Sequence, residues 1–386
     1  MLKACANLPL RAKCWAVKIP LSRVYIDDAI KQRILAAVDS ENFILGKECT
    51  AFEQELAAHT ATKHCVLTSS WTSGVHMLLL ALGVKAGDEI IVPSHTAFPS
   101  VEPIVQVGAK PIFIDVDESY TLDVKQLESL ITPRTVGILP VHLYGHPADL
   151  ARVKAIAEKR KLLWIEDCAQ AQGAAWNGKK VGSIAPYGAF SFFPSKNLTV
   201  FGDGGCITLN DDAIAEKLRM MRNHGRKDKY VHEFVGFNMR FNEMQAAVGR
   251  EQLKHLDDFN ARRRQAVVWY RERLKEIPGV QLPIEREGCT PVYHMFVVQV
   301  EKREALAKHL KEQGIGTGVH YPVPNHQQPA MTKLYKDLPK LPVTEKIVDR
   351  ILSLPIFPKI TEAEVSEVCQ QIGAFMKKSE KAMVTV

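Results

Sequence analysis

Apolar residues recur along the chain in two alternating patterns from about Asp28 onward. Stretches with apolar positions three or four residues apart predict helices, at Ile30–Val38, Thr50–Thr60, Thr72–Leu82, Leu122–Ile131 and Asp149–Lys159. Short runs rich in Val, Ile, Leu or Phe predict buried strands, at His64–Thr68, Glu89–Val92, Pro111–Ile114, Val136–Val141, Leu162–Glu166, Ala189–Phe193 and Cys206–Leu209. Because helices that alternate with buried strands are typical of a parallel sheet covered on both faces, the pattern predicts an α/β fold. We expect a mainly parallel seven-stranded sheet between helices.

The pattern changes after about Arg250. A long charged stretch predicts a helix over Asn242–Leu274, followed by a strand over Val292–Val300 and a helix over Glu304–Gln313. Residues 314–329 are rich in Gly, His and Pro, and two more helices are predicted after them. We therefore expect a leader at residues 1–25, a large α/β domain at 26–250, and a smaller C-terminal α/β domain at 251–386 that the long helix joins to the large one.

The composition excludes several classes of protein. Hydrophobic residues make up 46% of the 386 residues and charged residues 24%, which is typical of a globular protein and not of a disordered or fibrous one. The net charge of +7 is spread along the chain and no basic cluster is interleaved with aromatic residues, so we expect no nucleic-acid partner. No apolar run approaches the about 18 residues of a membrane span. The eight cysteines include no CxxC pair, which favours reduced thiols, no metal site and a cytoplasmic location.

Three features follow predicted strands and carry candidate chemistry. The turn after the first strand, Ser69–Gly74, opens a helix, and helix N-termini attract phosphate groups. Glu166 and Asp167 lie at the end of a later strand, where parallel sheets bind their ligands, so at least one of the two acids is expected in that crevice. Lys196 lies between an apolar run and a glycine-rich turn, and shelter from water would lower the pKa of its amine. Taken singly, each has a plainer interpretation: a capped helix, a surface acid and a solvent-exposed lysine.

Together the three features are the parts that a pyridoxal phosphate site requires. The cofactor needs a lysine that reacts with its aldehyde, a carboxylate that pairs with its ring nitrogen, and a seat for its phosphate. Lys196, an acid of the pair Glu166 and Asp167, and the helix start after the first strand supply these groups in one chain. A nicotinamide-dependent enzyme would instead have GxGxxG after the first strand, and SSWTSG does not provide it.

Several long segments, in order, resemble one known family: the DegT/StrS-type nucleotide-sugar aminotransferases, which are pyridoxal phosphate enzymes of fold type I, like aspartate aminotransferase. The resemblance extends from about Val24 to Ala374. The segments that carry it are FEQELA, GDEIIVPSHT, GAKPIFIDVD, ITPRTVGILPVHLYGHPADL, EDCAQAQGAAWNGKKVGS, FSFFPSKNLTVFGDGG, NMRFNEMQAAVG, GTGVHYPVPNH and LSLPIFP.

The resemblance implies a role for individual residues. It places Lys196 at the Schiff-base position and Asp167 at the partner of the ring nitrogen, and these are the expected catalytic residues. The other expected contacts to the cofactor are Thr72, Ser73, Gln170, Ser191 and Asn238. In such enzymes the residue at Asn238 reaches the phosphate of the partner subunit, which implies a homodimer with shared active sites. Substrate contacts are expected from Arg240, His320 and Tyr321.

Two positions depart from the family pattern. The family's phosphate turn usually has glycine where this chain has Trp71, so a local rearrangement is expected there. The family often has an aromatic residue after the threonine at position 96, and this chain has Ala97. The interpretation leaves open whether His95 or Phe98 covers the cofactor ring. Elsewhere, His294 is expected to be a core or interface residue and Cys168 a buried filler.

The resemblance implies transfer of an amino group, with L-glutamate as the usual donor, to a keto-sugar linked to a nucleotide. Such sugars belong to surface polysaccharides or antibiotics. Three alternatives stay open: a keto-cyclitol acceptor, a sugar dehydratase of the same fold, and a regulatory relative without activity. Dehydratases of this kind have histidine in place of the Schiff-base lysine, so Lys196 argues against the second.

Overall fold

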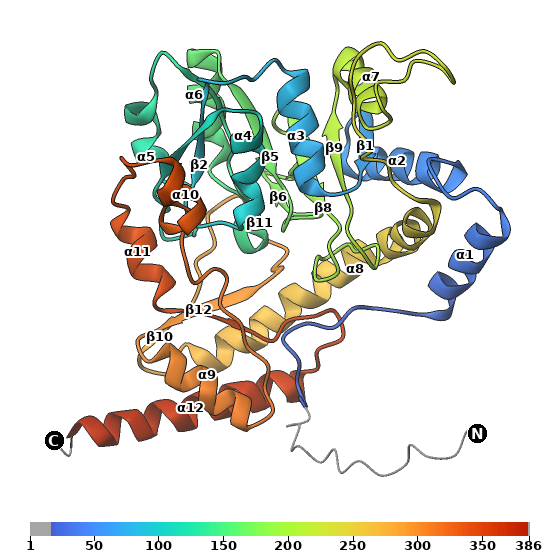
Figure 1. Ribbon diagram of the computed structural model, residues 1–386. Helices are drawn as coiled ribbons and strands as arrows, with labels where there is room; N and C mark the ends of the chain where they lie inside the picture. The colour runs from blue at the N-terminus through green and yellow to red at the C-terminus, as the bar shows by residue number, and fades with distance from the viewer. Residues whose placement is uncertain (1–16, 385–386) are drawn as a thin grey trace, which may run out of the picture.

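A seven-stranded sheet forms the centre of the computed structural model, which describes residues 17–384 (Figure 1). Its strand order is β1-β9-β8-β5-β4-β2-β3, and β9 runs antiparallel to both of its neighbours while the other pairings are parallel. The strands are β1 (His64–Thr68), β2 (Glu89–Pro93), β3 (Lys110–Ile114), β4 (Thr135–Ile138), β5 (Leu163–Asp167), β8 (Tyr187–Ser191) and β9 (Gly205–Leu209). All seven predicted strands are present, which confirms the α/β fold and the mainly parallel sheet.

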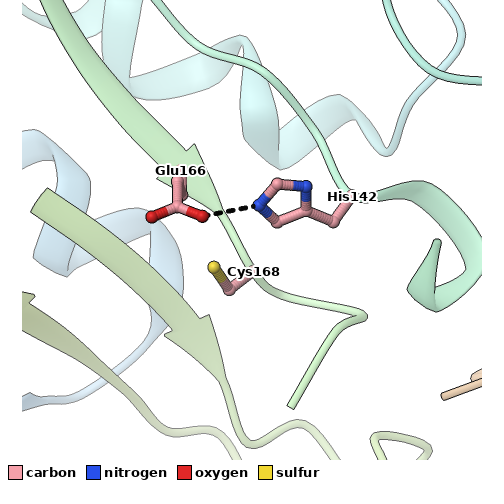
Figure 2. Close-up of side chains that lie close together, drawn as sticks. All are labelled: His142, Glu166 and Cys168. Atoms are coloured by element: carbon pink, nitrogen blue, oxygen red, sulfur yellow. Dashed lines mark hydrogen bonds and ion pairs between the residues drawn. The ribbon is translucent and has the colours of Figure 1, made fainter. Parts of the chain in front are cut away.

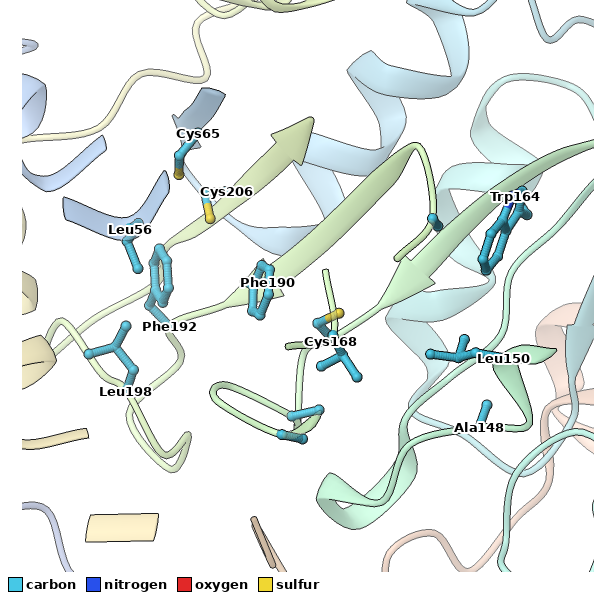
Figure 3. Close-up of a cluster of buried hydrophobic side chains, with 14 of the residues drawn as sticks. Leu56, Cys65, Ala148, Leu150, Trp164, Cys168, Phe190, Phe192, Leu198 and Cys206 are labelled. Carbon is cyan, nitrogen blue, oxygen red and sulfur yellow. The ribbon is translucent and has the colours of Figure 1, made fainter. Parts of the chain in front are cut away.

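Helices cover both faces of this sheet, and each face has its own hydrophobic cluster. One face is covered by α2 (Lys47–Thr60), α6 (Leu150–Arg160) and the first half of α8 (Glu243–Leu274). Figure 3 shows part of this cluster, where Phe190 and Phe192 lie near Leu56 and Leu198. The other face is covered by α3 (Trp71–Ala81), α4 (Glu102–Gln106) and α7 (Asp212–Met221).

The C-terminal part has a smaller sheet and its own core. The strands β10 (Val280–Gln281), β12 (Phe296–Val300) and β13 (Ile351–Leu354) pair antiparallel, and the last half of α8, α9 (Arg303–Glu312) and α12 (Glu362–Val384) pack against them. A third small sheet joins β6 (Ala175–Trp176), β7 (Lys179–Lys180) and β11 (Cys289–Thr290). No helix within residues 17–384 is both long enough and apolar enough to cross a membrane.

Some predicted elements differ from the observed ones. The helix predicted over Leu122–Ile131 is a short α5 (Val124–Leu127) followed by a 3₁₀ turn, because the segment turns between two buried strands. The strand predicted from Val292 begins at Phe296. Between residues 329 and 384 there are three helices, not two, since α10 (Pro329–Leu334) and α11 (Pro342–Val348) precede α12.

The end of the predicted leader is attached to the C-terminal part. The Lys18 N–H donates to the carbonyl of Gly314, and the Gly316 N–H donates to the carbonyl of Ile19. Ile19 is buried in the same core as α9 and α12. Residues 1–16 of the leader lie outside the described part of the chain. The proposed division at residue 250 falls within α8, which is one unbroken helix, so both domain boundaries stay predictions.

A buried carboxylate joins the start of α8 to the start of α2. Glu243 accepts hydrogen bonds from the N–H groups of Gly46, Glu48 and Cys49, at 2.7, 2.8 and 3.0 Å. An acid at a helix N-terminus satisfies donors that have no partner within the helix. Burial alone would raise the pKa of Glu243, but these hydrogen bonds hold it below its ordinary value.

We expect Glu243→Gln to lower the free energy of unfolding by about 1.5–3 kcal/mol at pH 7, since hydrogen bonds to a charged acceptor are the stronger ones. Because the folded pKa lies below the unfolded one, the contribution of this carboxylate is present above pH 4.5 and is lost as the pH falls through the folded value. Urea titrations of both proteins at pH 7 and pH 4 measure the difference. A difference that stays the same at both values of pH would contradict the assigned charge.

Candidate active site

The predicted phosphate turn is a capped helix start with two free donors. The Ser70 hydroxyl accepts from the Ser73 N–H at 3.0 Å, and the Ser73 hydroxyl accepts from the Ser70 N–H at 2.9 Å. The Gly74 N–H donates to the carbonyl of Ser70. Among the described residues, none accepts a hydrogen bond from the N–H groups of Trp71 and Thr72. A helix start with open N–H groups binds phosphate well.

Trp71 does not disturb this turn, although a rearrangement was expected there. Its ring is only 5% exposed and belongs to the cluster that α3 forms with the sheet. The indole Nε1 donates to the carbonyl of Ala189 in β8, at 3.2 Å. The large side chain is therefore accommodated by burial beneath the helix, and the turn keeps its ordinary cap.

Asp167 ends β5 with its carboxylate buried at the carboxyl edge of the sheet. Its side chain is held by the Ser100 hydroxyl at 2.8 Å and by the Ala169 N–H at 3.0 Å. The Thr96 hydroxyl contacts the Ser100 hydroxyl at 3.0 Å. Burial raises the pKa of Asp167, and the two hydrogen bonds and the charge of Lys196 oppose this rise. A buried carboxylate of this kind favours a cationic partner.

Ser100 is a residue of the site that was not predicted from the sequence. It lies in a 3₁₀ turn, Phe98–Ser100, just after the carboxyl end of β2. Its position next to a strand end was the available signal, but a serine in a Pro-containing turn has many ordinary uses. Only the pairing of β2 with β4 and of β4 with β5 brings Ser100 near Asp167.

Lys196 lies in the loop after β8, where its N–H donates to the carbonyl of Phe193 at 2.8 Å. Burial lowers the pKa of its amine to about 8, while the negative charge of Asp167 acts in the opposite direction. Each of these two groups thus shifts the pKa of the other. The structure brings together the two residues that the sequence analysis expected to be catalytic.

A third predicted residue, Gln170, is locked by two neighbours. Its Oε1 accepts from the Tyr144 N–H at 2.7 Å, and its Nε2 donates to the Tyr321 hydroxyl at 3.1 Å. Burial, and to a smaller extent the negative charge of Asp167, raise the pKa of Tyr321 to about 12. Tyr321, predicted to contact substrate, therefore lies in the same cluster as Gln170 and Asp167.

His320 and His95 meet at the hydroxyl of Tyr144. This hydroxyl donates to the carbonyl of His320 and contacts Nε2 of His95 at 2.8 Å. Burial lowers the pKa of His320 to about 4 and that of His95 to about 3. His320 Nδ1 also contacts the hydroxyl of Ser353 at 2.9 Å. Both imidazoles are therefore neutral at pH 7, and an uncharged His320 ring is available beside the site.

The two candidates for covering the cofactor ring are held by protein contacts. His95 is almost fully buried against Tyr144 and Tyr120. Phe98 packs against the cluster on the α3 face of the sheet. Ala97, between them in sequence, is half-buried. The choice between His95 and Phe98 stays a prediction.

Of the remaining predicted residues, Ser191 lies on the sheet, whereas Asn238 and Arg240 contact each other in the segment before α8. Ser191 is the last residue of β8, and its hydroxyl accepts weakly from the Phe193 N–H at 3.4 Å. Asn238 is exposed, and its side-chain oxygen accepts from Arg240 Nε at 3.0 Å. In the described chain no hydrogen bond joins the side chains of this pair to Asp167, Gln170 or Lys196, whereas the carbonyl of Met239, between them in sequence, accepts from the Ser69 N–H at 3.1 Å.

Glu166 points away from Asp167 and belongs to a different cluster, shown in Figure 2. The Ala148 N–H donates to His142 Nδ1 at 3.0 Å, so His142 donates through Nε2 to Glu166 at 3.1 Å. The other carboxylate oxygen of Glu166 accepts from the Ala185 N–H at 2.7 Å. Cys168 lies within 4.8 Å of this pair, and burial raises the pKa of its thiol. Because protein atoms already use the ligand positions of His142 and Glu166, we interpret this group as structural support beneath the sheet edge.

His294 supports the lysine loop from the C-terminal part. The side-chain amide of Asn197 donates to Asn260 in α8 at 2.9 Å and to the carbonyl of Val292 at 3.1 Å. Its oxygen is therefore an acceptor, and it receives a hydrogen bond from His294 Nδ1 at 3.3 Å. His294 is a buried residue, as expected, and it holds the residue next to Lys196.

The chain resembles known proteins over nearly its whole length. The sequence profile of the DegT/DnrJ/EryC1/StrS aminotransferase family matches residues 24–373. The erythromycin biosynthesis sensory transduction protein EryC1 of Saccharopolyspora erythraea is 44% identical over 346 residues, which cover 89% of this chain and 94% of that protein. The dTDP-3-amino-3,4,6-trideoxy-alpha-D-glucose transaminase of Streptomyces venezuelae is 41% identical over 356 residues, covering 92% and 93%. The crystal structure of S. venezuelae DesV in complex with a ketimine intermediate is 40% identical, covers 93% of this chain and 98% of its own, and superposes with a TM-score of 0.90.

Proposed function

Because the chain belongs to the DegT/DnrJ/EryC1/StrS aminotransferase family, we propose that it transfers an amino group from L-glutamate to a keto-sugar carried by a nucleotide, with pyridoxal phosphate as cofactor. Aminotransferases of this type use pyridoxal phosphate. The observation that carries the proposal is the pair of the half-buried Lys196 and the buried Asp167, in which each group shifts the pKa of the other. Similarity to the dTDP-3-amino-3,4,6-trideoxy-alpha-D-glucose transaminase of Streptomyces venezuelae supports the choice of acceptor.

The donor set at the site fits this cofactor. Open N–H groups at Trp71 and Thr72, together with the nearby hydroxyl of Ser191, suit a phosphate. The buried Asp167 carboxylate suits a protonated ring nitrogen, and Lys196 suits the aldehyde. When bound, pyridoxal phosphate supplies the aldehyde that accepts the amino group and a ring that withdraws electrons from the reacting carbon.

The residues of the chain then have distinct tasks. The Nζ of Lys196 would hold the aldehyde of the cofactor and, when free, would take up and return the proton at the donor's α-carbon. Asp167 would keep the ring nitrogen protonated, with Ser100 and the Ala169 N–H fixing the carboxylate. Gln170 is expected beside the ring oxygen, held there by Tyr144 and Tyr321. Burial keeps bulk water from these groups, which strengthens each charge interaction.

The lowered pKa of Lys196 predicts how cofactor binding depends on pH. Only the neutral amine attacks an aldehyde, so the rate of covalent binding should rise between pH 7 and pH 9 with a midpoint near the pKa of about 8. The rate is measured from the visible absorbance after apoprotein is mixed with pyridoxal phosphate. The control is a lysine amide that is acetylated on its α-nitrogen and has a free side-chain amine. Its reaction rate should keep rising with pH up to about pH 10.4. A protein curve that follows this control would contradict the burial of the amine.

The acceptor is tested by a screen. Purified protein is mixed with pyridoxal phosphate, L-glutamate and a panel of dTDP-linked and UDP-linked keto-sugars, with keto-cyclitols included. Formation of 2-oxoglutarate together with an aminated sugar, detected by mass spectrometry, supports the proposal. If no acceptor in the panel is aminated while the cofactor binds covalently, the regulatory alternative gains support, since the EryC1 relative carries the name of a sensory transduction protein.

We further infer a homodimer whose active sites lie at the subunit interface, with Asn238 and Arg240 serving the partner's site. The support is the exposure of Asn238 and of large apolar side chains: Leu35, Val38, Phe43, Ile44, Phe193, Phe201, Tyr230 and Val235. A contiguous patch formed by several of them would be covered by the partner subunit.

Shared sites predict complementation between two inactive variants. The homodimers of Asn238→Ala and of Lys196→Ala should both be poorly active. When the two variants are mixed so that their subunits exchange, half of the dimers contain one subunit of each kind, and each such dimer has one intact site. The mixture should therefore recover about one quarter of wild-type activity. Size-exclusion chromatography with light scattering reports the dimer. Recovery of no activity from a confirmed mixed dimer would contradict shared sites.

A further inference from the structure

Trp71 connects two parts of the candidate site that are far apart in sequence. It is the first residue of α3, directly before Thr72 and Ser73. Its backbone lies in the turn expected to hold the phosphate, while its ring lies under the helix with Nε1 donating to the carbonyl of Ala189. One side chain therefore joins the turn to strand β8.

Ala189 is the residue where three site elements meet. It pairs with Asp167 between the parallel strands β8 and β5. Its carbonyl also accepts from the N–H of Cys168, the residue after Asp167, at 2.8 Å. Ser191 follows two positions later on β8, and side chains two apart point to the same face of a sheet. The indole hydrogen bond thus reaches the backbone that positions both Asp167 and Ser191.

The helix start also lies close to β9, the strand next to β8. A Cβ atom added to Gly205 would lie 2.5 Å from the Trp71 nitrogen and 2.7 Å from the Ser70 carbonyl carbon. The turn is therefore held at two neighbouring strands of the sheet, by the close approach to β9 and by the indole hydrogen bond to β8. A small shift of the turn relative to Asp167 would change the distance between the two ends of the cofactor site.

We propose that Trp71 is a positioning residue for the cofactor, which holds the phosphate turn at a set distance from Asp167 and Ser191 through its hydrogen bond to Ala189. This inference rests on the proposed function. It assigns Trp71 no contact with the reacting atoms. It predicts that loss of the indole N–H weakens the part of cofactor affinity that depends on the phosphate.

The test compares pyridoxal phosphate with pyridoxal, which has the same aldehyde and ring but no phosphate. Trp71→Phe removes the N–H donor and keeps most of the apolar volume. We expect its dissociation constant for pyridoxal phosphate to rise about 3–10-fold, in line with one lost hydrogen bond. Its dissociation constant for pyridoxal should change less than about twofold. Both constants are measured from the visible absorbance of full-length protein.

Trp164→Phe is the matched control. Trp164 is also buried, but it belongs to the cluster on the other face of the sheet. We expect it to lower the unfolding temperature to a similar extent and to leave both dissociation constants unchanged. If Trp71→Phe does not fold, Trp71→Met is measured in the same way.

The outcomes distinguish a failure of the positioning role of Trp71 from a failure of the proposed function. A selective loss of phosphate-dependent affinity in the Trp71 variant supports the positioning role. Equal losses for pyridoxal phosphate and pyridoxal, or equal effects of Trp71→Phe and Trp164→Phe, overturn it, because general loosening of the core would act on both ligands. If the wild-type protein binds neither aldehyde at Lys196, the proposed function itself fails.

Discussion

Replacing Lys196 with alanine is expected to abolish amino transfer, with a loss of at least about 10⁴-fold. The variant loses the amine that binds the cofactor aldehyde and the base that moves the proton, and water does not replace either efficiently. Its visible cofactor absorbance should disappear as well. Reduction of the wild-type holoenzyme with borohydride, followed by peptide mass spectrometry, should find the cofactor attached to Lys196.

Two variants test whether this effect is specific. Lys196→Arg keeps a cation in the pocket but removes the reactive amine, so it should be as inactive as Lys196→Ala. Lys179→Ala removes an exposed lysine in β7 and should keep wild-type turnover and labelling. Substantial activity in either Lys196 variant, or a label on a different lysine, would refute the role of Lys196.

The second largest effect is expected from Asp167→Asn, with a loss of about 10²–10³-fold in kcat, the size found when one preorganised electrostatic group is removed. Asparagine has nearly the same shape but has no charge to stabilise a protonated ring nitrogen. Its amide oxygen can still accept only one of the two hydrogen bonds that come from Ser100 and Ala169. Cofactor binding through Lys196 should persist, so the visible absorbance should remain while turnover falls.

The adjacent acid provides a control for this substitution. Glu166→Gln also removes a buried charge from the end of β5, but its side chain faces His142 on the other side of the sheet edge. We expect it to lower the free energy of unfolding by about 1–3 kcal/mol and to leave kcat within a few-fold of wild type. Ser100→Ala should fall between the two, with roughly a tenfold loss of kcat. If Glu166→Gln reduced kcat as much as Asp167→Asn, the special role of Asp167 would be wrong.

The strands of the large sheet were predictable because each is a short apolar run, and a buried strand needs apolar side chains on both faces. The same argument located the adjacent acids Glu166 and Asp167, and Lys196 after a later strand, since ligands bind at the carboxyl ends of parallel strands. The strand Ile351–Leu354 was missed because its run of four residues continues into Pro355 and resembles a loop.

Local sequence could not show which of two neighbouring acids enters the site. Glu166 and Asp167 are adjacent, and alternation along a strand sends one to each face. The acid that faces α3 is decided by the order of the strands and by the helices that cover each face of the sheet. The same holds for Trp71. Its ring was expected to disturb the turn, but it is buried in the space beneath α3 instead.

By itself, the order of apolar and polar residues determined that this chain forms an α/β sheet and that a lysine, an aspartate and a capped helix start follow its strands. These are properties of local spacing and side-chain chemistry. Only the tertiary structure decided that Ser100 holds Asp167, that Glu243 caps α2 and that the indole of Trp71 reaches β8. Such contacts join residues far apart in sequence, and they form only when packing of the helices on the sheet sets the distances between them.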